Sequence, residues 1–319
     1  MKNLTARPLL LLVALLAATA SFTPAAWAAD DDALVDLAPH WTEGQTSRFA
    51  FVTKLQQSVE VTLGDRNREQ STETDFEGEM TWTVDRVTAD GGARCTMTLD
   101  WMSVVTAGDE ATRVDSRKSA SADAKVMHGL LKAMAGAPLE VVVAPDGRVT
   151  QVKGVKEMKA RCDQPDLIPD TLDFEETASG MAQFAAAPPP LATGDSWQAD
   201  FRWKHDLGHV DEDWRFRLDH VETLAGVRLA TVTGTAKSEL DVDPEQLETP
   251  EGAPPLRIRL DDREAETRVL MDLSRGEAVG RYSRVSESVV AEMKLPNGVF
   301  RRVMNETSTS EMIRLSESP

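Results

Sequence analysis

Apolar and polar residues alternate with a period of two through most of the chain after its first 28 residues. In the segment 197–203, tryptophan, alanine, phenylalanine and tryptophan occupy the odd positions, and polar residues occupy the even ones. The same alternation occurs around Trp214 and around Trp82. Because successive side chains of a strand point to opposite faces, this pattern predicts half-buried β-strands.

Turn sequences that contain glycine separate the alternating segments. They occur at Ala89–Gly92, Pro145–Gly147, Ser274–Gly276 and Pro296–Gly298. Turns of this kind between alternating segments are typical of antiparallel hairpins. The predicted fold class is therefore mainly β (α+β), with two related antiparallel sheet units that are strongly curved or sandwich-like.

A few packed helices are expected beside the strands. Residues Ser121–Ala135 place apolar side chains at helical spacing, with Gly136 as a stop signal. Shorter helices are predicted over Val155–Arg161 and over Glu175–Ala187, where the second is ended by the triple proline that starts at Pro188.

The strand pattern occurs twice along the chain. Residues 79–87 match residues 213–221 in the placement of apolar positions, and a glycine precedes the first strand of each half, at Gly44 and at Gly194. We interpret this as an internal duplication. The alternative is that any two antiparallel meanders of similar length share such a pattern.

These patterns divide the chain into four parts. A signal peptide covers 1–28, and a first antiparallel β unit with one helix covers 29–162. A helical and proline-rich connector covers 163–192, and a second antiparallel β unit covers 193–319.

The first 28 residues have the three features of a secretory signal peptide. Lys2 and Arg7 make the start positive, Leu9–Ala20 is an apolar run shorter than a membrane span, and small residues stand at Ala26 and Ala28. We therefore expect an exported protein, periplasmic or extracellular, with no transmembrane segment after the leader is removed.

The chain is strongly acidic, with 35 Lys and Arg residues against 53 Asp and Glu residues and a formal net charge of −18. Such a charge repels nucleic acids and anionic lipid surfaces. It leaves a basic protein as a plausible partner, beside a small apolar ligand. A solvated acidic surface without any partner explains the same composition.

Two cysteines, Cys95 and Cys162, allow one disulfide in an oxidising compartment. The bond would close a loop of roughly 70 residues, and the chain-entropy model assigns such a loop about 4 kcal/mol of stabilisation. The alternative is two separate buried thiols, because spacing alone does not bring the sulfurs together.

Motifs of enzymes are absent from the sequence. It has no Gly-x-Ser-x-Gly, no His-Glu-x-x-His, no phosphate-binding glycine loop and no dinucleotide fingerprint. We therefore assign no catalytic, cofactor-binding or metal-ligating residue and expect no cofactor. A protein that is not an enzyme is favoured.

Six aromatic residues fall on the predicted inward positions of the strands. They are Trp82, Trp197, Phe201, Trp203, Trp214 and Phe216. Such a face can line an apolar ligand site. The alternative is ordinary core packing, because any sheet needs large side chains on its buried face.

The chain resembles a family of secreted bacterial proteins of unknown function that is common in planctomycete-type genomes. The resemblance rests on the leader and on four short motifs. They are Gly44–Thr46, the strands around Trp82, the hairpin Ala144–Val149 and the restart Gly194–Trp197. The family implies no activity and no site residues. A more distant likeness, in architecture alone, is to periplasmic lipoprotein carriers, whose curved sheets enclose an apolar cavity.

Our hypothesis from the sequence is an exported, non-enzymatic binding or envelope-associated protein that holds an apolar or lipid-like ligand on a concave sheet face. One alternative is an extracellular hydrolase whose carboxylates come together only in the fold. Another is a structural or interaction module of the cell surface with an acidic face for a basic partner.

Overall fold

The chain divides into two compact units, residues 1–33 and 34–319. A computed structural model describes most of the second, namely residues 34–107, 112–119, 124–162, 188–205, 208–242, 256–295 and 298–315, with the backbone alone at 203–205, 208 and 242. The predicted leader, the helix predicted over 175–187 and most of the predicted connector lie outside the described residues.

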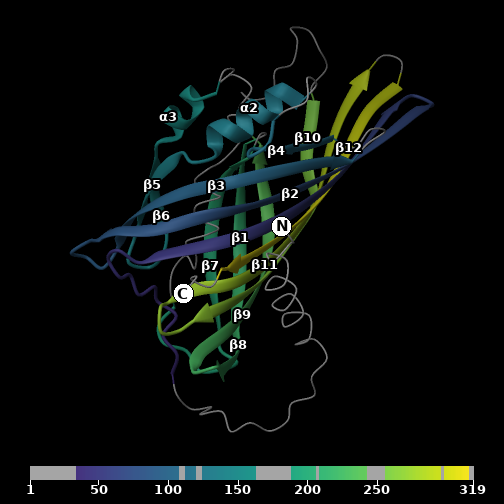
Figure 1. Cartoon of the computed structure of the whole chain (residues 1–319). Helices are drawn as coiled ribbons and strands as arrows, with labels where there is room; N and C mark the ends of the chain where they lie inside the picture. Colours follow the sequence, from purple (N-terminus) through teal and green to yellow (C-terminus); the bar gives the residue numbers. More distant parts are fainter. Residues whose placement is uncertain are drawn as a thin grey trace. The chain divides into compact units, whose positions relative to one another are not determined.

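The described strands form one antiparallel sheet with the order β6-β5-β3-β2-β1-β12-β11-β10-β9-β8-β7, and β4 pairs with β3 beside this path. Figure 1 shows this sheet. The strands of the first half are β1 (Thr46–Leu63), β2 (Arg66–Val87), β3 (Ala93–Ala107), β4 (Thr112–Asp115), β5 (Pro138–Val143) and β6 (Val149–Lys153). The strands of the second half are β7 (Ser196–His205), β8 (Gly208–Leu224), β9 (Val227–Val242), β10 (Leu256–Asp272), β11 (Glu277–Leu295) and β12 (Gly298–Arg314).

The first and last strands join the two halves. β1 pairs with β12 in an unbroken register from Phe49 opposite Arg314 to Leu63 opposite Phe300. The mainly β fold class predicted from alternation is therefore confirmed. The two predicted sheet units are parts of one open sheet.

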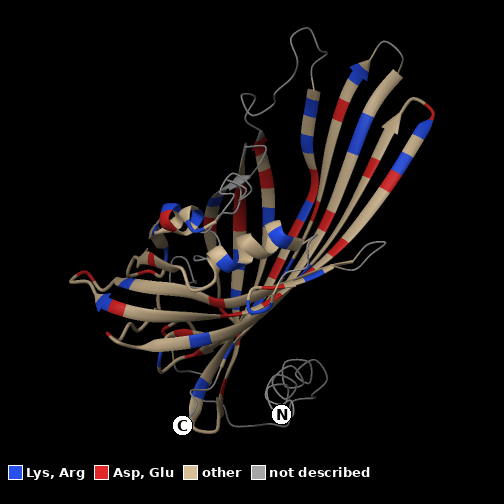
Figure 2. Cartoon of the chain, turned by 45° about the horizontal axis from the view of Figure 1, so that its top comes forward, with Lys and Arg blue, Asp and Glu red and all other residues tan. Residues whose placement is uncertain are grey.

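Two hydrophobic clusters lie on the same face of this sheet. Trp82, Met97 and Leu139 are cross-strand neighbours in the first cluster, and Leu218 and Val232 are neighbours in the second. We call this side the core face and the opposite side the charged face. Figure 2 shows acidic and basic residues distributed along the long strands.

Two helices pack against the first cluster. α2 (Lys125–Met134) and α3 (Val155–Ala160) fall within the helices predicted over Ser121–Ala135 and Val155–Arg161. Met134 and Met158 are buried in the first cluster. The helices therefore cover the core face over the first half of the sheet.

The start of each half has the same backbone geometry. Gly44 N–H donates to the carbonyl of Val84 at 2.8 Å, and Gly194 N–H donates to the carbonyl of Leu218 at 2.7 Å. Both glycines have a positive φ, and a β-bulge follows both Val84 and Leu218. These shared details support the interpretation as a duplication, which stays a prediction.

The two cysteines are not joined in the structure. Cys95 is fully buried in the first hydrophobic cluster, whereas Cys162 packs with Ala133 in a small separate cluster. Of the two alternatives that the sequence leaves open, this arrangement corresponds to two separate buried thiols. Burial raises the pKa of the Cys95 thiol to about 12, which suppresses the reactive thiolate.

We expect Cys95 to resist iodoacetamide in the native protein at pH 8, because the thiol is buried and protonated. In denaturant without reductant, both cysteines are expected to be alkylated. Peptide mass mapping of the two samples measures this, and a disulfide-linked peptide containing Cys95 and Cys162 would contradict it.

A buried carboxylate holds the end of β4. The Asp115 side chain is 2% exposed and accepts hydrogen bonds from Arg117 Nε at 3.0 Å and Arg117 Nη2 at 2.9 Å. The guanidinium of Arg117 lies 3.6 Å from the centre of the Trp101 ring. The hydrogen bonds from Arg117 hold the pKa of Asp115 well below its usual value, against the opposing effect of burial.

Asp115→Asn should lower the free energy of unfolding by about 1 kcal/mol at pH 7, a modest value because Arg117 is half-exposed. A carboxylate with a lowered folded-state pKa stabilises the fold above its unfolded pKa of about 4 and loses this contribution as the pH falls further. The difference between wild type and variant should therefore shrink below pH 4.

Urea unfolding at pH 7, 5, 4 and 3 measures that trend. The control is Asp65→Asn, which alters an exposed aspartate in the turn between β1 and β2. A constant difference between wild type and Asp115→Asn across this pH range would show that the charge of Asp115 contributes nothing.

Candidate functional site

Most of the aromatic residues predicted to form a ligand face pack against one another. The rings of Trp197 and Phe216 stack with centroids 5.2 Å apart, and those of Trp214 and Phe216 stack at 5.4 Å. Phe201 packs against the same cluster. The Phe216 ring also covers Gly234 on β9, where an added Cβ would lie 2.6 Å from Phe216 Cδ1. These rings fill the core of the second half.

The predicted aromatic face is not continuous. Trp82 is 6% exposed and belongs to the first hydrophobic cluster, whereas Trp197 and Phe216 pack in the second. The ligand role suggested for these aromatic residues stays a prediction. The side chain of Trp203 lies outside the part of the chain that the structure describes.

A buried ion-pair network lies next to the aromatic cluster on the core face. Arg263 donates from Nε and Nη2 to Glu212 Oε1 at 3.1 and 2.9 Å, and from Nη1 to Glu287 Oε2. The three side chains are 7%, 8% and 8% exposed. Trp214 Nε1 donates to the second oxygen of Glu212 at 2.8 Å. One cation thus holds two buried carboxylates in place.

The network continues across the sheet as a polar row. Glu306 on β12 lies opposite Glu287, and Gln57 on β1 lies opposite Glu306. Gln57 Nε2 donates to Glu306 Oε2 at 3.1 Å. We call the set Glu212, Arg263, Glu287, Glu306 and Gln57 the polar row. It crosses the core face from β8 to β1.

Beyond the polar row the core face becomes apolar again. Three successive cross-strand rows over β1, β12, β11 and β10 carry it: Val59, Met304, Val289 and Leu260; Val61, Arg302, Ala291 and Ile258; Leu63, Phe300, Met293 and Leu256. We call the apolar members the distal apolar face. Arg302, with an exposed side chain, is the one charged residue in these rows.

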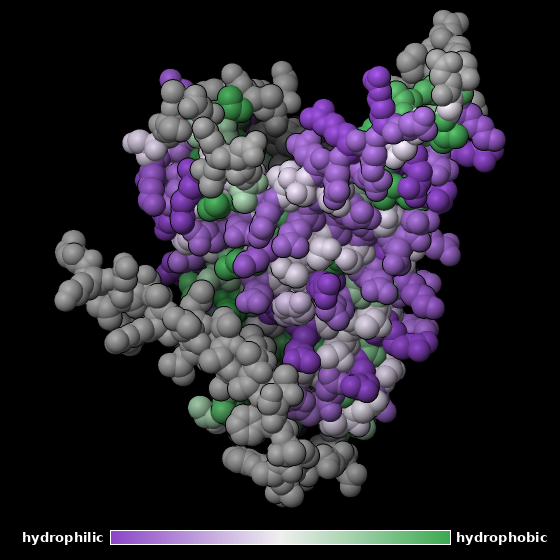
Figure 3. All heavy atoms as spheres, turned by 90° about the vertical axis from the view of Figure 1, so that its right-hand side faces the viewer, coloured by the Kyte–Doolittle hydropathy of each residue, from purple (hydrophilic) through white to green (hydrophobic). Residues whose placement is uncertain are grey.

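The distal apolar face is partly open. Val289 is buried, but the other members are at least partly exposed, and Leu63 is 49% exposed. None of them belongs to the hydrophobic clusters of the described residues. Figure 3 shows hydrophobic residues near the ends of the long strands, among hydrophilic neighbours.

The charged face at the same strand positions is mainly polar. Glu60, Arg301, Glu292, Arg257 and Arg259 lie on it, and the valines Val303 and Val290 stand between Glu60 and Arg259. This end of the sheet is therefore amphipathic, with one side suited to water and the other side suited to an apolar contact.

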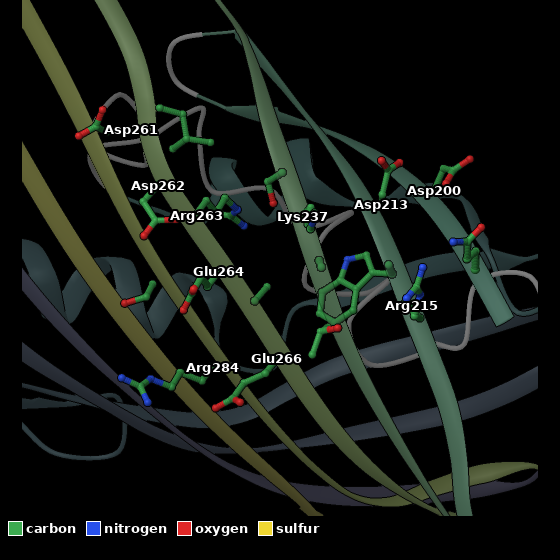
Figure 4. Close-up of a pocket in the computed structure, with 18 residues that line it drawn as sticks. Asp200, Asp213, Arg215, Lys237, Asp261, Asp262, Arg263, Glu264, Glu266 and Arg284 are labelled. Atoms are coloured by element: carbon green, nitrogen blue, oxygen red, sulfur yellow. The ribbon is translucent and has the colours of Figure 1, made fainter. Parts of the chain in front are cut away.

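A cleft of about 1060 Å³ lies over β7 to β11, mainly on the charged face (Figure 4). Its acidic lining residues are Asp200, Asp213, Asp261, Asp262, Glu264 and Glu266, and its basic ones are Arg215, Lys237, Arg263 and Arg284. Asp200 and Asp213 lie directly opposite one another on β7 and β8. The fold thus brings several carboxylates together here, which is the arrangement that an extracellular hydrolase would need. The hydrolase alternative stays a prediction.

The described residues contain no group of three or more His, Cys, Asp or Glu side chains arranged to hold a metal ion. Neither described helix has the length and hydrophobicity that crossing a lipid bilayer requires.

No family model matches the sequence, and no curated protein matches it, so the resemblance to secreted bacterial proteins stays a prediction. Among solved structures, one that describes lipid–protein interactions in lipovitellin is similar with a TM-score of 0.38, at 9% identity over 86% of this chain and 25% of that chain. DynF from the dynemicin pathway of Micromonospora chersina has a TM-score of 0.18, at 8% identity over 90% of this chain and 92% of that chain.

A DUF1329 family protein from Desulfovibrio piger has a TM-score of 0.14, at 8% identity over 80% of this chain and 83% of that chain. The chain spans about a quarter of the length of the lipovitellin chain. Similarities this low carry no argument about function.

Sequence reasoning missed the polar row, although a signal for it exists. Glu212 points to the same face of β8 as Trp214 and Phe216, because it precedes them by an even number of residues. In the same way, Glu287 points to the same face of β11 as Val285 and Val289. A charged residue at an inward position is a sign of a buried ion pair, because it needs a partner of opposite charge.

Arg263→Met should lower the free energy of unfolding by about 3–5 kcal/mol, because it leaves Glu212 and Glu287 buried without their cation. The matched control is Arg259→Met on the same strand, whose side chain is 53% exposed and should change stability little. Chemical denaturation of both variants at pH 7 measures this. Equal stabilities would show that the polar row does not hold the sheet together.

Proposed function

We propose that this protein is exported and binds an apolar, lipid-like molecule on the distal apolar face, without enzymatic activity. The observation that carries the proposal is the set of partly exposed apolar side chains in three cross-strand rows, with a mainly polar opposite face. A contiguous apolar surface that is partly exposed and bordered by polar residues is typical of a contact site.

The polar row supports the proposal because it separates the open apolar surface from the packed core. Glu212, Arg263 and Glu287 are buried and mutually paired, so the aromatic cluster behind them is closed to a ligand. An acyl chain on the distal apolar face would gain about 0.8 kcal/mol for each methylene group removed from water.

The charge of the protein selects among lipids. With a formal net charge of −18, it is repelled by anionic membrane surfaces. A single neutral or zwitterionic lipid is therefore a better ligand than an anionic bilayer.

Binding of a fluorescent phosphatidylcholine to the purified protein tests the proposal, and Met293→Glu is the variant. We expect at least a tenfold weaker binding, about 1.4 kcal/mol, because the new carboxylate must be desolvated against the acyl chain. Lys294→Glu is the matched control, since it lies one residue further on the charged face of β11 and should bind as the wild type does.

Two results would refute the proposal. One is a wild-type protein that binds no phosphatidylcholine and yields no lipid by mass spectrometry after purification. The other is equal lipid binding by Met293→Glu and Lys294→Glu. Export is tested separately by N-terminal sequencing of the protein recovered from the periplasmic or extracellular fraction, which should start after Ala28.

A further inference from the structure

Strands β9 and β10 stop pairing although both continue. Their ladder ends where Glu264 lies opposite Lys237. Beyond this point, residues 238–242 of β9 pair with β8, and residues 256–263 of β10 pair with β11. In the described part of the chain, the sheet therefore has two strand edges that face each other here.

Such edges carry backbone groups without a ladder partner. In each antiparallel strand, half of the N–H and C=O groups point away from the paired neighbour. No backbone hydrogen bond among the described residues joins 256–262 or 238–242 to any strand other than β11 and β8. An extended chain is the ligand that satisfies a row of such groups.

The cleft reaches the point where this separation begins. Its lining includes Lys237 and Ser238 from β9 and Leu260, Arg263 and Glu264 from β10. Paired strands lie about 4.8 Å apart, so an inserted strand needs edges about 10 Å apart. The Arg263 side chain forms an ion pair with Glu212 on β8 at 2.9 Å. It therefore spans the gap between β9 and β10 on the core face, next to the last paired residues, Glu264 and Lys237.

Side chains along the two edges specify the pattern of an inserted strand. On the core face, β10 presents Leu256, Ile258 and Leu260. On the charged face, Arg259 of β10 is basic, whereas Glu239 of β9 is acidic. An inserted strand would therefore place apolar residues on one side and polar or charged residues on the other.

From this geometry we infer that the separation between β9 and β10 binds an extended polypeptide segment of a partner protein, which adds as a strand to the edge of β10. Its alternate residues are apolar on the core face and polar on the charged face. This interaction goes beyond lipid binding and does not depend on it.

A synthetic peptide with the sequence of residues 288–295 is the probe, because this segment already pairs with β10 along its other edge and carries apolar residues at 289, 291, 293 and 295. Residue-resolved amide hydrogen exchange measures the result on the full mature protein. In the free protein, alternate amides of 256–263 should exchange much faster than their neighbours, which donate to β11. A saturating amount of the peptide should slow the fast set at least tenfold.

The control peptide has the same side chains but is N-methylated at alternate residues, which removes its edge donors. It should bind at least ten times more weakly. Equal binding of the two peptides would show a merely hydrophobic contact and overturn the inference. Slow exchange at all amides of 256–263 in the free protein would overturn it as well, because the edge would then already be occupied.

Discussion

The antiparallel pairing of β1 with β12 is the constraint on which the rest of the structure depends. It joins the first strand to the last in an unbroken register and so turns two meanders into one sheet. Because side chains alternate strictly along each strand, this register also decides that both hydrophobic clusters lie on the same face. A one-residue slip would place Phe49 and Met312 on opposite faces of the sheet, so that one of them would leave the core.

The core face has a closed part, which forms the hydrophobic core, and a partly open apolar part, which can contact a ligand. Next to the clusters it is closed by packed side chains, and beyond the polar row it is apolar and partly open. A buried Glu-Arg-Glu arrangement contributes little net stability compared with packed apolar residues, but removing one of its members is costly because a charge is then left buried without its partner. Arg263 thereby fixes the place where the closed surface ends.

The same position marks a change in the sheet itself. Glu264 and Lys237 are the last pair between β9 and β10, and Arg263 is the next residue along β10. The ion pair from Arg263 to Glu212 connects β10 to β8 across the start of the separation. One side chain thus links the polar row of the core face to the cleft of the charged face.

Alternation and turn residues alone were enough to predict the strands, their antiparallel arrangement and two helices, because these features depend on neighbours close in sequence. Trp197 and Phe216 were correctly expected on an inward face, but whether such rings are packed or open depends on what lies across the strands. The row from Gln57 to Glu212 joins residues far apart in the chain, and so does the distal apolar face. Their formation required the register of β1 against β12 and of β10 against β11, which no local pattern specifies.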